Sequence, residues 1–275
     1  GQREVWALSR RPGVAIPDAC VVTWNGHEFG PWQTALEGAQ VVINLCGANI
    51  AAERWTQARK EDLVASRLLS TRALVAALAA EPEGPTTFIS ASAVGYYGDR
   101  GDQELIERAV SGGDVLARLC VDWESEARRA PATVRTVTLR TGVVLGQGGG
   151  ALAKMLPLFK LGLGGPIGTG RQWTSWIARE DLIGLIVHLL DSDVSGAVNA
   201  TAPAPVTNEE FSKTLGQVLH RPAKLRAPQA LVKFAFGELG GMLLGGQRAI
   251  PQRALQSGYQ FKRPTLESAL QACLC

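Results

Sequence analysis

Residues 86–98, which read TTFISASAVGYYG, constrain the fold of this chain more than any other stretch. The first four residues are β-branched or aromatic and follow Pro85, a pattern that predicts a short buried strand. The run then changes to small and hydroxyl-bearing residues and ends on two tyrosines flanked by glycines. A strand that opens into polar side chains places them at the carboxyl end of a parallel sheet, where open α/β sheets bind ligands. A core strand followed by an ordinary aromatic turn would read the same way, and this run alone does not separate the two.

Strand-like and helix-like segments alternate through the first two-thirds of the chain. The patterns predict strands at residues 4–9, 41–47, 86–92 and 134–140, and helices at 56–80 and 114–129. Such alternation is typical of an α/β fold, in which a doubly wound parallel sheet is covered by helices.

The character of the sequence changes after residue 147, where three consecutive glycines predict a flexible break. Beyond it the patterns predict helices at 151–161 and 180–190, a strand at 196–202, and a capping box in which Thr207 begins a helix with Glu210 three residues later. We therefore expect two parts. Residues 1–147 form the sheet domain, and residues 148–275 form a smaller, mostly helical substrate lobe, with 175–202 returning to the sheet.

Charge and cysteine content narrow the class of protein. The formal net charge is +3 and the 28 basic residues are scattered, which argues against nucleic acid as the partner. The five cysteines are odd in number, lack metal-ligand spacing and mostly lie in apolar runs, as is typical of reduced thiols in a cytoplasmic protein without a metal site. No apolar run approaches the roughly 18 residues of a membrane span, so we expect no membrane partner.

Ser9 and Arg10 end the first predicted strand. Nucleotide-binding α/β folds read the ribose at the end of a strand, and a guanidinium there suits a 2′-phosphate, whereas a carboxylate suits the bare ribose of NAD. The pair therefore favours NADP, and the alternative is a solvated basic turn. A glycine-rich turn belongs roughly 20 residues before such a group, which is further than this chain extends before Arg10. We expect either that the first strand and glycine turn are missing or that the fold is a different one.

Two further segments are candidates for cofactor contact. The strand that begins at residue 41 ends in Leu45, Cys46 and Gly47, and small residues there let the backbone approach a ligand closely. An ordinary junction of strand and turn would read the same. Asp62 and Arg67 lie five positions apart on a long predicted helix, about 140° round its axis, so they do not share a face. Spacing alone favours a surface arginine at position 67.

The candidate chemistry lies at Ser90, Ser92, Tyr96 and Tyr97. A reductase needs a proton donor near the carbonyl and a hydroxyl that polarises it, and tyrosine and serine serve both purposes when a cation lies near. No lysine lies close in sequence, which weakens this interpretation. The glycine-rich residues 162–170 lack the GK[ST] ending of a phosphate-binding loop, so we expect a loop that closes over the substrate.

Taken together, these stretches resemble the extended short-chain dehydrogenase/reductase superfamily, and within it the sugar-epimerase-like branch. The motifs that carry the resemblance are GYYG at 95–98, RTGVVLG at 140–146, LGLGGPIG at 161–168 and GGQRAIP at 245–251. The resemblance spans essentially the whole chain, continues into a short helical C-terminal domain, and implies a Rossmann-type domain that binds NADP(H). The cofactor contacts that it implies are Ser9 and Arg10 at the adenosine phosphate, Leu45, Cys46 and Gly47 beside the cofactor, Asp62 and Arg67 on the long helix, and Thr141, Gly142 and Val143 near the nicotinamide.

This chain departs from the expected pattern in three places, one of which is Ala178, where relatives usually show a histidine after the isoleucine. The glycine-rich opening turn, whose amides and following helix hold the pyrophosphate, is absent. The catalytic Tyr-x-x-x-Lys is also absent, and the helix that should hold it reads RLCVDWE at 118–124.

We therefore expect an epimerase-like, NADP(H)-binding oxidoreductase that acts on a small molecule, either a carbonyl compound or a sugar nucleotide. Ser90 or Ser92 would polarise the carbonyl or hydroxyl, and Tyr96 or Tyr97 would donate or accept the proton. The missing tyrosine and lysine favour one alternative, a regulatory protein that binds NADP(H) without catalysis. A truncated, inactive fragment is the other.

Overall fold

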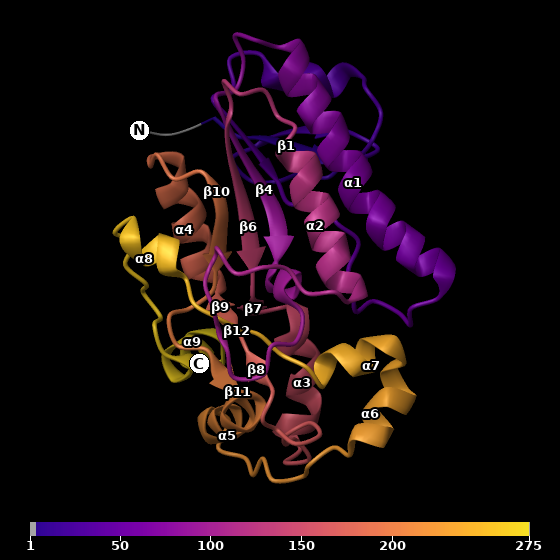
Figure 1. Ribbon diagram of the computed structural model, residues 1–275, viewed down its shortest axis with the longest axis vertical. Coiled ribbons are helices and arrows are strands. Elements are labelled where there is room, and N and C mark those ends of the chain that lie inside the picture. The colour runs from indigo at the N-terminus through magenta and orange to yellow at the C-terminus, as the bar shows by residue number, and fades with distance from the viewer. Residues whose placement is uncertain (1–3, 275) are drawn as a thin grey trace.

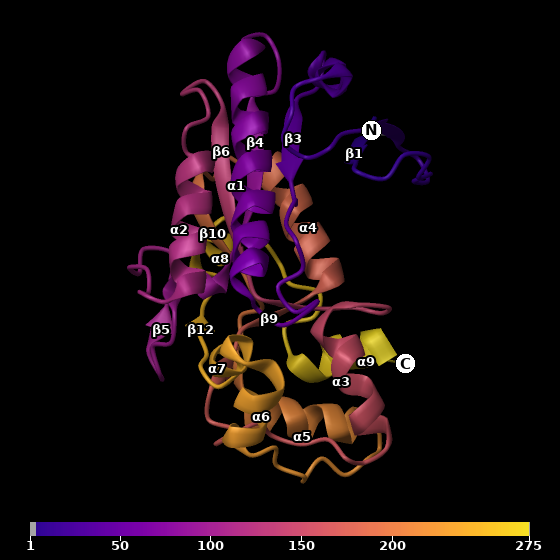
Figure 2. The same cartoon turned by 90° about the vertical axis from the view of Figure 1, so that its right-hand side faces the viewer.

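The computed structural model describes residues 4–274, and its centre is a parallel β-sheet. Four strands pair in the order β10-β6-β4-β3, and a separate parallel pair, β1-β2, lies on the β3 side of this sheet (Figure 2). The strands are β1 (Trp6–Ser9), β2 (Cys20–Thr23), β3 (Val41–Asn44), β4 (Thr87–Ala93), β6 (Arg135–Thr141) and β10 (Gly196–Ala200). The predicted α/β fold with a parallel sheet is confirmed.

The sheet is interrupted between β1 and β3. Within residues 4–274, β1 pairs with β2 alone and β3 with β4 alone, so no backbone pairing joins the β1-β2 pair to the four-stranded sheet. A doubly wound sheet of strand order 3-2-1-4-5-6 carries its first strand at this place. The prediction of a missing first strand and glycine turn stays a prediction.

Helices cover both faces of the sheet. α1 (Gln57–Ala80) and α2 (Val115–Ala127) pack over one face, where Phe88 of β4 is buried, and α4 (Arg179–Leu190) packs over the other, where Ile89 is buried. Thr56 begins α1 by accepting the Arg59 N–H at 3.1 Å. The helices predicted at 56–80, 114–129 and 180–190 are confirmed to within two residues.

By length and composition alone, α1 would also be able to cross a membrane, contrary to what the sequence led us to expect. In this structure α1 is a core helix, because Leu63, Leu74 and Leu78 are each 3% exposed or less and the helix packs against the sheet and α2. One such helix is weak evidence for a membrane protein, since core helices pass the same test.

A second lobe lies beyond the carboxyl ends of the strands, towards which the arrowheads of β4 and β6 point (Figure 1). Its core gathers side chains from five elements, namely Leu145, Leu152, Trp176, Phe211 and Leu270. The remaining helices are α3 (Gly150–Lys160), α5 (Asn208–Val218), α6 (Gln229–Phe236), α7 (Glu238–Leu243), α8 (Gln252–Gln256) and α9 (Leu266–Leu274), with two 3-10 turns, η1 (Pro31–Leu36) and η2 (Val94–Tyr97). The remaining strands are short, namely β5 (Glu104–Leu105), β7 (Val143–Leu145), β8 (Trp173–Thr174), β9 (Trp176–Ala178), β11 (Val206–Thr207) and β12 (Arg248–Ala249).

Candidate functional site

The face of the sheet under α1 and α2 becomes polar towards the carboxyl ends of the strands. Strand register aligns buried polar residues in two rows, the first formed by Asn44, Ser90 and Thr138 and the second by Ser92, Arg140 and Asn199. Because buried polar groups cost free energy unless they are hydrogen-bonded, the partners of these side chains decide which of them are free for chemistry.

Arg140 is the centre of the second row. Its Nε and Nη2 donate to the two carboxylate oxygens of Glu124 on α2, at 2.8 and 2.9 Å, and its Nη1 donates to the Tyr97 hydroxyl at 3.0 Å. The Ser92 hydroxyl donates to Glu124 at 2.8 Å, and the Tyr97 hydroxyl donates to Asn199 Oδ1 at 2.6 Å. Burial raises the pKa of Tyr97 to about 12, although Arg140 opposes the shift. The hydroxyls of Ser92 and Tyr97 are thus engaged within the core.

The other two candidate hydroxyls are placed differently. Ser90 is fully buried, and its Oγ has no hydrogen-bond partner among the described residues. Tyr96 is half-buried, with its ring centre 3.4 Å from the Arg140 guanidinium carbon and edge-on to Tyr97. No hydrogen bond within residues 4–274 involves the Tyr96 hydroxyl. Tyr96 therefore combines a nearby cation, partial exposure and a hydroxyl that is available to a ligand.

The loop after β3 is open to solvent where the sequence predicts cofactor contact. Leu45 is 63% exposed and Gly47 is also exposed. Arg67 is turned towards this loop, because a Cβ built on Gly47 would lie 3.1 Å from the guanidinium carbon and Nη2 donates to Ala48 O at 3.0 Å. The surface position that spacing favoured for Arg67 is therefore wrong, because the loop folds back over α1. Asp62, about 140° round the helix axis from Arg67, is exposed.

The ends of β1 and β3 lie on the same side of the sheet. Cys46 is half-buried and donates its N–H to Asn44 Oδ1 at 3.1 Å. Burial raises the pKa of the Cys46 thiol, and Arg10 lies close enough to oppose that shift. Ser9 Oγ accepts the Arg11 N–H at 3.1 Å. Arg10 itself is exposed and makes no hydrogen bond or ion pair within the described part of the chain, so its guanidinium is available to an anionic ligand such as a 2′-phosphate.

The third predicted contact segment, Thr141 to Val143, joins β6 to β7. A Cβ on Gly142 would lie 2.6 Å from Ser175 O, so only glycine fits there, and the Val143 N–H donates to Ser175 O at 2.8 Å. All three residues are partly exposed at the carboxyl end of the sheet.

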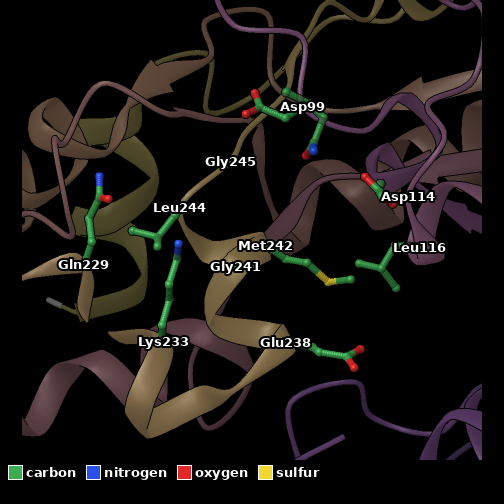
Figure 3. Close-up of a pocket in the computed structure, with 12 residues that line it drawn as sticks. Asp99, Asp114, Leu116, Gln229, Lys233, Glu238, Gly241, Met242, Leu244 and Gly245 are labelled. Carbon is green, nitrogen blue, oxygen red and sulfur yellow. The ribbon is translucent and has the colours of Figure 1, made fainter. Parts of the chain in front are cut away.

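A cleft of about 400 Å³ lies between the sheet domain and α6–α7 (Figure 3). It is lined by Gly95, Asp99, Asp114 and Leu116 of the sheet domain and by Gln229, Lys233, Glu238, Gly241, Met242, Leu244, Gly245 and Gln247 from the C-terminal part of the chain. None of these residues is among the site residues predicted from the sequence. Of the four charged ones, only Asp114 had a readable signal, because it is the first residue of the helix predicted at 114–129, where an N-cap is expected, and it caps α2 by accepting the Ala117 N–H at 2.8 Å.

The helix that should hold the superfamily's tyrosine and lysine offers the cleft one residue of its own, Leu116. One turn further on, Cys120 is buried, and burial raises the pKa of its thiol to about 12. α2 thus contributes no proton donor to the cleft.

An open parallel sheet with an available arginine at one strand end, an exposed small-residue loop at another and a cleft beyond them is an arrangement typical of nucleotide-binding α/β proteins. Residues 2–201 match the NAD dependent epimerase/dehydratase family, and the chain belongs to that family. Residues 227–273 match DUF1731, a domain of unknown function.

Three similar proteins extend this comparison. Epimerase family protein Mb2239 of Mycobacterium bovis is 46% identical over 253 residues, which cover 90% of this chain and 82% of that protein. The crystal structure of human epimerase family protein SDR39U1 (isoform 2) with NADPH is 37% identical with a TM-score of 0.90, over 98% of this chain and 90% of that one. The nucleoside-diphosphate sugar epimerase of Corynebacterium glutamicum is 33% identical with a TM-score of 0.71, over 94% of this chain and 52% of that one. The expected resemblance is confirmed, while the cytoplasmic location stays a prediction.

Proposed function

We propose that this chain binds NADP(H) at the carboxyl ends of β1 and β3 and acts as an oxidoreductase on a small carbonyl compound or alcohol. The observation that carries the proposal is the similarity, over 98% of the chain, to a human protein whose structure holds NADPH. The available guanidinium of Arg10 supports the choice of NADP over NAD, because guanidinium binds phosphate oxygens in pairs.

In this proposal the chain's own residues bind and orient the cofactor. Ser9 and Arg10 hold the 2′-phosphate, the exposed loop at Leu45, Cys46 and Gly47 lies along the cofactor, and Arg67 fixes that loop through Ala48 O at 3.0 Å. Thr141, Gly142 and Val143 lie near the nicotinamide, whereas the exposed Asp62 is the weakest of the predicted contacts. When bound, NADPH supplies the hydride.

The charges of the cleft favour a small carbonyl substrate over a sugar nucleotide. Asp99, Asp114 and Glu238 line it against one lysine, Lys233. Carboxylates repel a diphosphate, and none of the described residues that line the cleft is an arginine, the usual partner of phosphate. A ligand without phosphate avoids this repulsion and can place its carbon skeleton against Leu116 and the other apolar lining residues.

Tyr96 is the residue that we assign to proton transfer, because its hydroxyl is available and Arg140 lies against its ring. NADPH oxidation in the presence of a panel of aldehydes and ketones tests this assignment. Tyr96→Phe should lower turnover by about 10²-fold or more, the usual contribution of general acid catalysis, and should leave stability unchanged. Tyr97→Phe is the matched control, since it removes a buried hydroxyl and should lower stability first. Unchanged turnover in Tyr96→Phe would refute the role of Tyr96.

One observation favours a second function, an NADP(H)-binding regulatory protein without catalysis. Ser92 and Tyr97 are engaged in core hydrogen bonds, and α2 offers Leu116 to the cleft where a catalytic helix would offer a proton donor. Persistent absence of hydride transfer across the carbonyl and sugar-nucleotide panels, with NADPH still bound, would favour this reading.

A further inference from the structure

The wall of the cleft formed by α6 and α7 is a compact helical hairpin. Gly237 joins the two helices with a positive φ of 59°, which glycine adopts without strain. A Cβ on Gly240 would lie 2.6 Å from Val232 O, so the two helices are in direct contact. Because of this close packing, we expect the hairpin to move as one unit. Five of the residues that line the cleft belong to it, namely Gln229, Lys233, Glu238, Gly241 and Met242 (Figure 3).

Two basic side chains of the sheet domain hold this hairpin. Arg54, in the loop between β3 and α1, donates to the carbonyl oxygens of Phe234 and Ala235, the second at 3.2 Å. These carbonyls lie in the last turn of α6, where they lack partners within the helix and where the helix dipole favours a cation. Lys60, in the first turn of α1, forms an ion pair of 2.7 Å with Glu238 at the start of α7.

The loop that carries Arg54 is the one predicted to touch the cofactor, and side chains hold its backbone at successive residues. The Ala48 N–H donates to Ser66 Oγ at 3.0 Å. Beyond it, Asn49 O accepts from Arg59 at 2.6 Å, and Ile50 O accepts from the indole of a tryptophan in the same loop at 2.7 Å. Because residues 48–50 are held in this way, we expect a displacement at Gly47 to pass along the backbone towards Arg54.

We propose that Arg54 and Lys60 couple the two sites, so that a nicotinamide dinucleotide seated on the loop at residues 45–47 fixes the α6–α7 wall of the cleft. The proposal rests on the proposed function, because it requires that NADP(H) bind this loop. Coupling between sites is reciprocal, so a ligand that engages the cleft wall tightens cofactor binding by the same factor. Arg54 and Lys60 act as positioning residues that shape the cleft without contacting the reacting atoms.

Hydrogen exchange of residues 229–243, followed by mass spectrometry with and without saturating NADPH, tests the coupling. Allosteric couplings are typically about 5- to 150-fold, and we expect NADPH to slow exchange in this segment by at least the lower figure. In the variant Arg54→Ala/Lys60→Met the effect of NADPH should fall below twofold. Lys213→Met, an exposed lysine on α5, is the matched control and should keep the full effect. The single substitution Glu238→Gln removes the ion pair with little change of shape, and NADPH should slow exchange in it by an intermediate factor. This variant keeps the test valid even if the double variant folds poorly.

Nicotinamide fluorescence, measured on the same samples, reports NADPH binding and so separates a failure of cofactor binding from a failure of the coupling. Binding of NADPH with equal protection of 229–243 in the wild type and in Glu238→Gln and the double variant refutes the coupling and leaves the cofactor assignment standing. Absence of NADPH binding overturns the cofactor assignment and the coupling together. Protection that depends on Arg54 and Lys60 supports both.

Discussion

The buried ion pair between Glu124 and Arg140 gives a prediction with a defined magnitude. The two side chains are 0% and 4% exposed, and the pair also holds Ser92 and Tyr97. Replacing Glu124 with Gln leaves the Arg140 guanidinium buried without its counter-ion, a change that costs about 3–5 kcal/mol of unfolding free energy. A chain of this size loses about 2–4 °C of melting temperature per kcal/mol, so Glu124→Gln should melt roughly 6–20 °C lower.

Glu126 supplies the matched control because it lies two residues further on the same helix. Its partners, Arg72 and Arg129, are 56% and 65% exposed, and such pairs contribute about 0–1 kcal/mol. Urea denaturation of Glu124→Gln and Glu126→Gln, with the slope checked for constancy, measures both. The double variant Glu124→Leu/Arg140→Met should recover much of the loss, because it removes both charges. If Glu124→Gln lowers the free energy of unfolding no more than Glu126→Gln does, the Glu124–Arg140 pair does not have the predicted importance.

Three further predictions follow from the site. Burial raises the pKa of Tyr97 to about 12, above the ordinary 10. The contribution of the neutral Tyr97 side chain to stability is therefore full below pH 10 and is lost as the pH rises through 12. The free energy of unfolding, measured across this interval, should fall more steeply in the wild type than in Tyr97→Phe. Iodoacetamide should modify the exposed Cys20 and spare the buried Cys120, and NADPH should slow modification of Cys46; a Cys46 rate indifferent to saturating NADPH would contradict the placing of the cofactor. Adding a strand and glycine-rich turn before the first residue should fill the gap between β1 and β3 and tighten NADPH binding, which titration of both forms would show; equal affinity would contradict this.

The sequence predicts the sheet and the long helices well because their signals are local. Hydrophobic runs identify β3, β4 and β6, and the capping box at Thr207 and Glu210 forms as its spacing predicts. The pairs β7-β9, β8-β11 and β5-β12 were missed, because strands of two or three residues are too short to show a period.

The location of the candidate site could be predicted from the sequence, but the hydrogen-bond partners of its side chains could not. Parallel strands bring their ends together, so the positions of Leu45, Ser90 and Thr141 follow from the order of elements. The partners of the hydroxyls do not follow, because the Tyr97 hydroxyl bonds Asn199, 102 residues away in sequence. The orientation of Arg67 was missed for a related reason. Helical spacing gives the angle of a side chain round the helix axis, but it does not show that the loop at residues 47–48 folds over that side of the helix.

Binding of NADPH and NADH to this chain, measured by thermal shift in the wild type and in Arg10→Ala, tests the central claim most directly. A ligand at 100 times its dissociation constant stabilises the folded state by about 2.7 kcal/mol. We expect such a shift with NADPH, a smaller one with NADH, and loss of the difference in Arg10→Ala. No shift with either nucleotide, or equal shifts in the wild type, would contradict it.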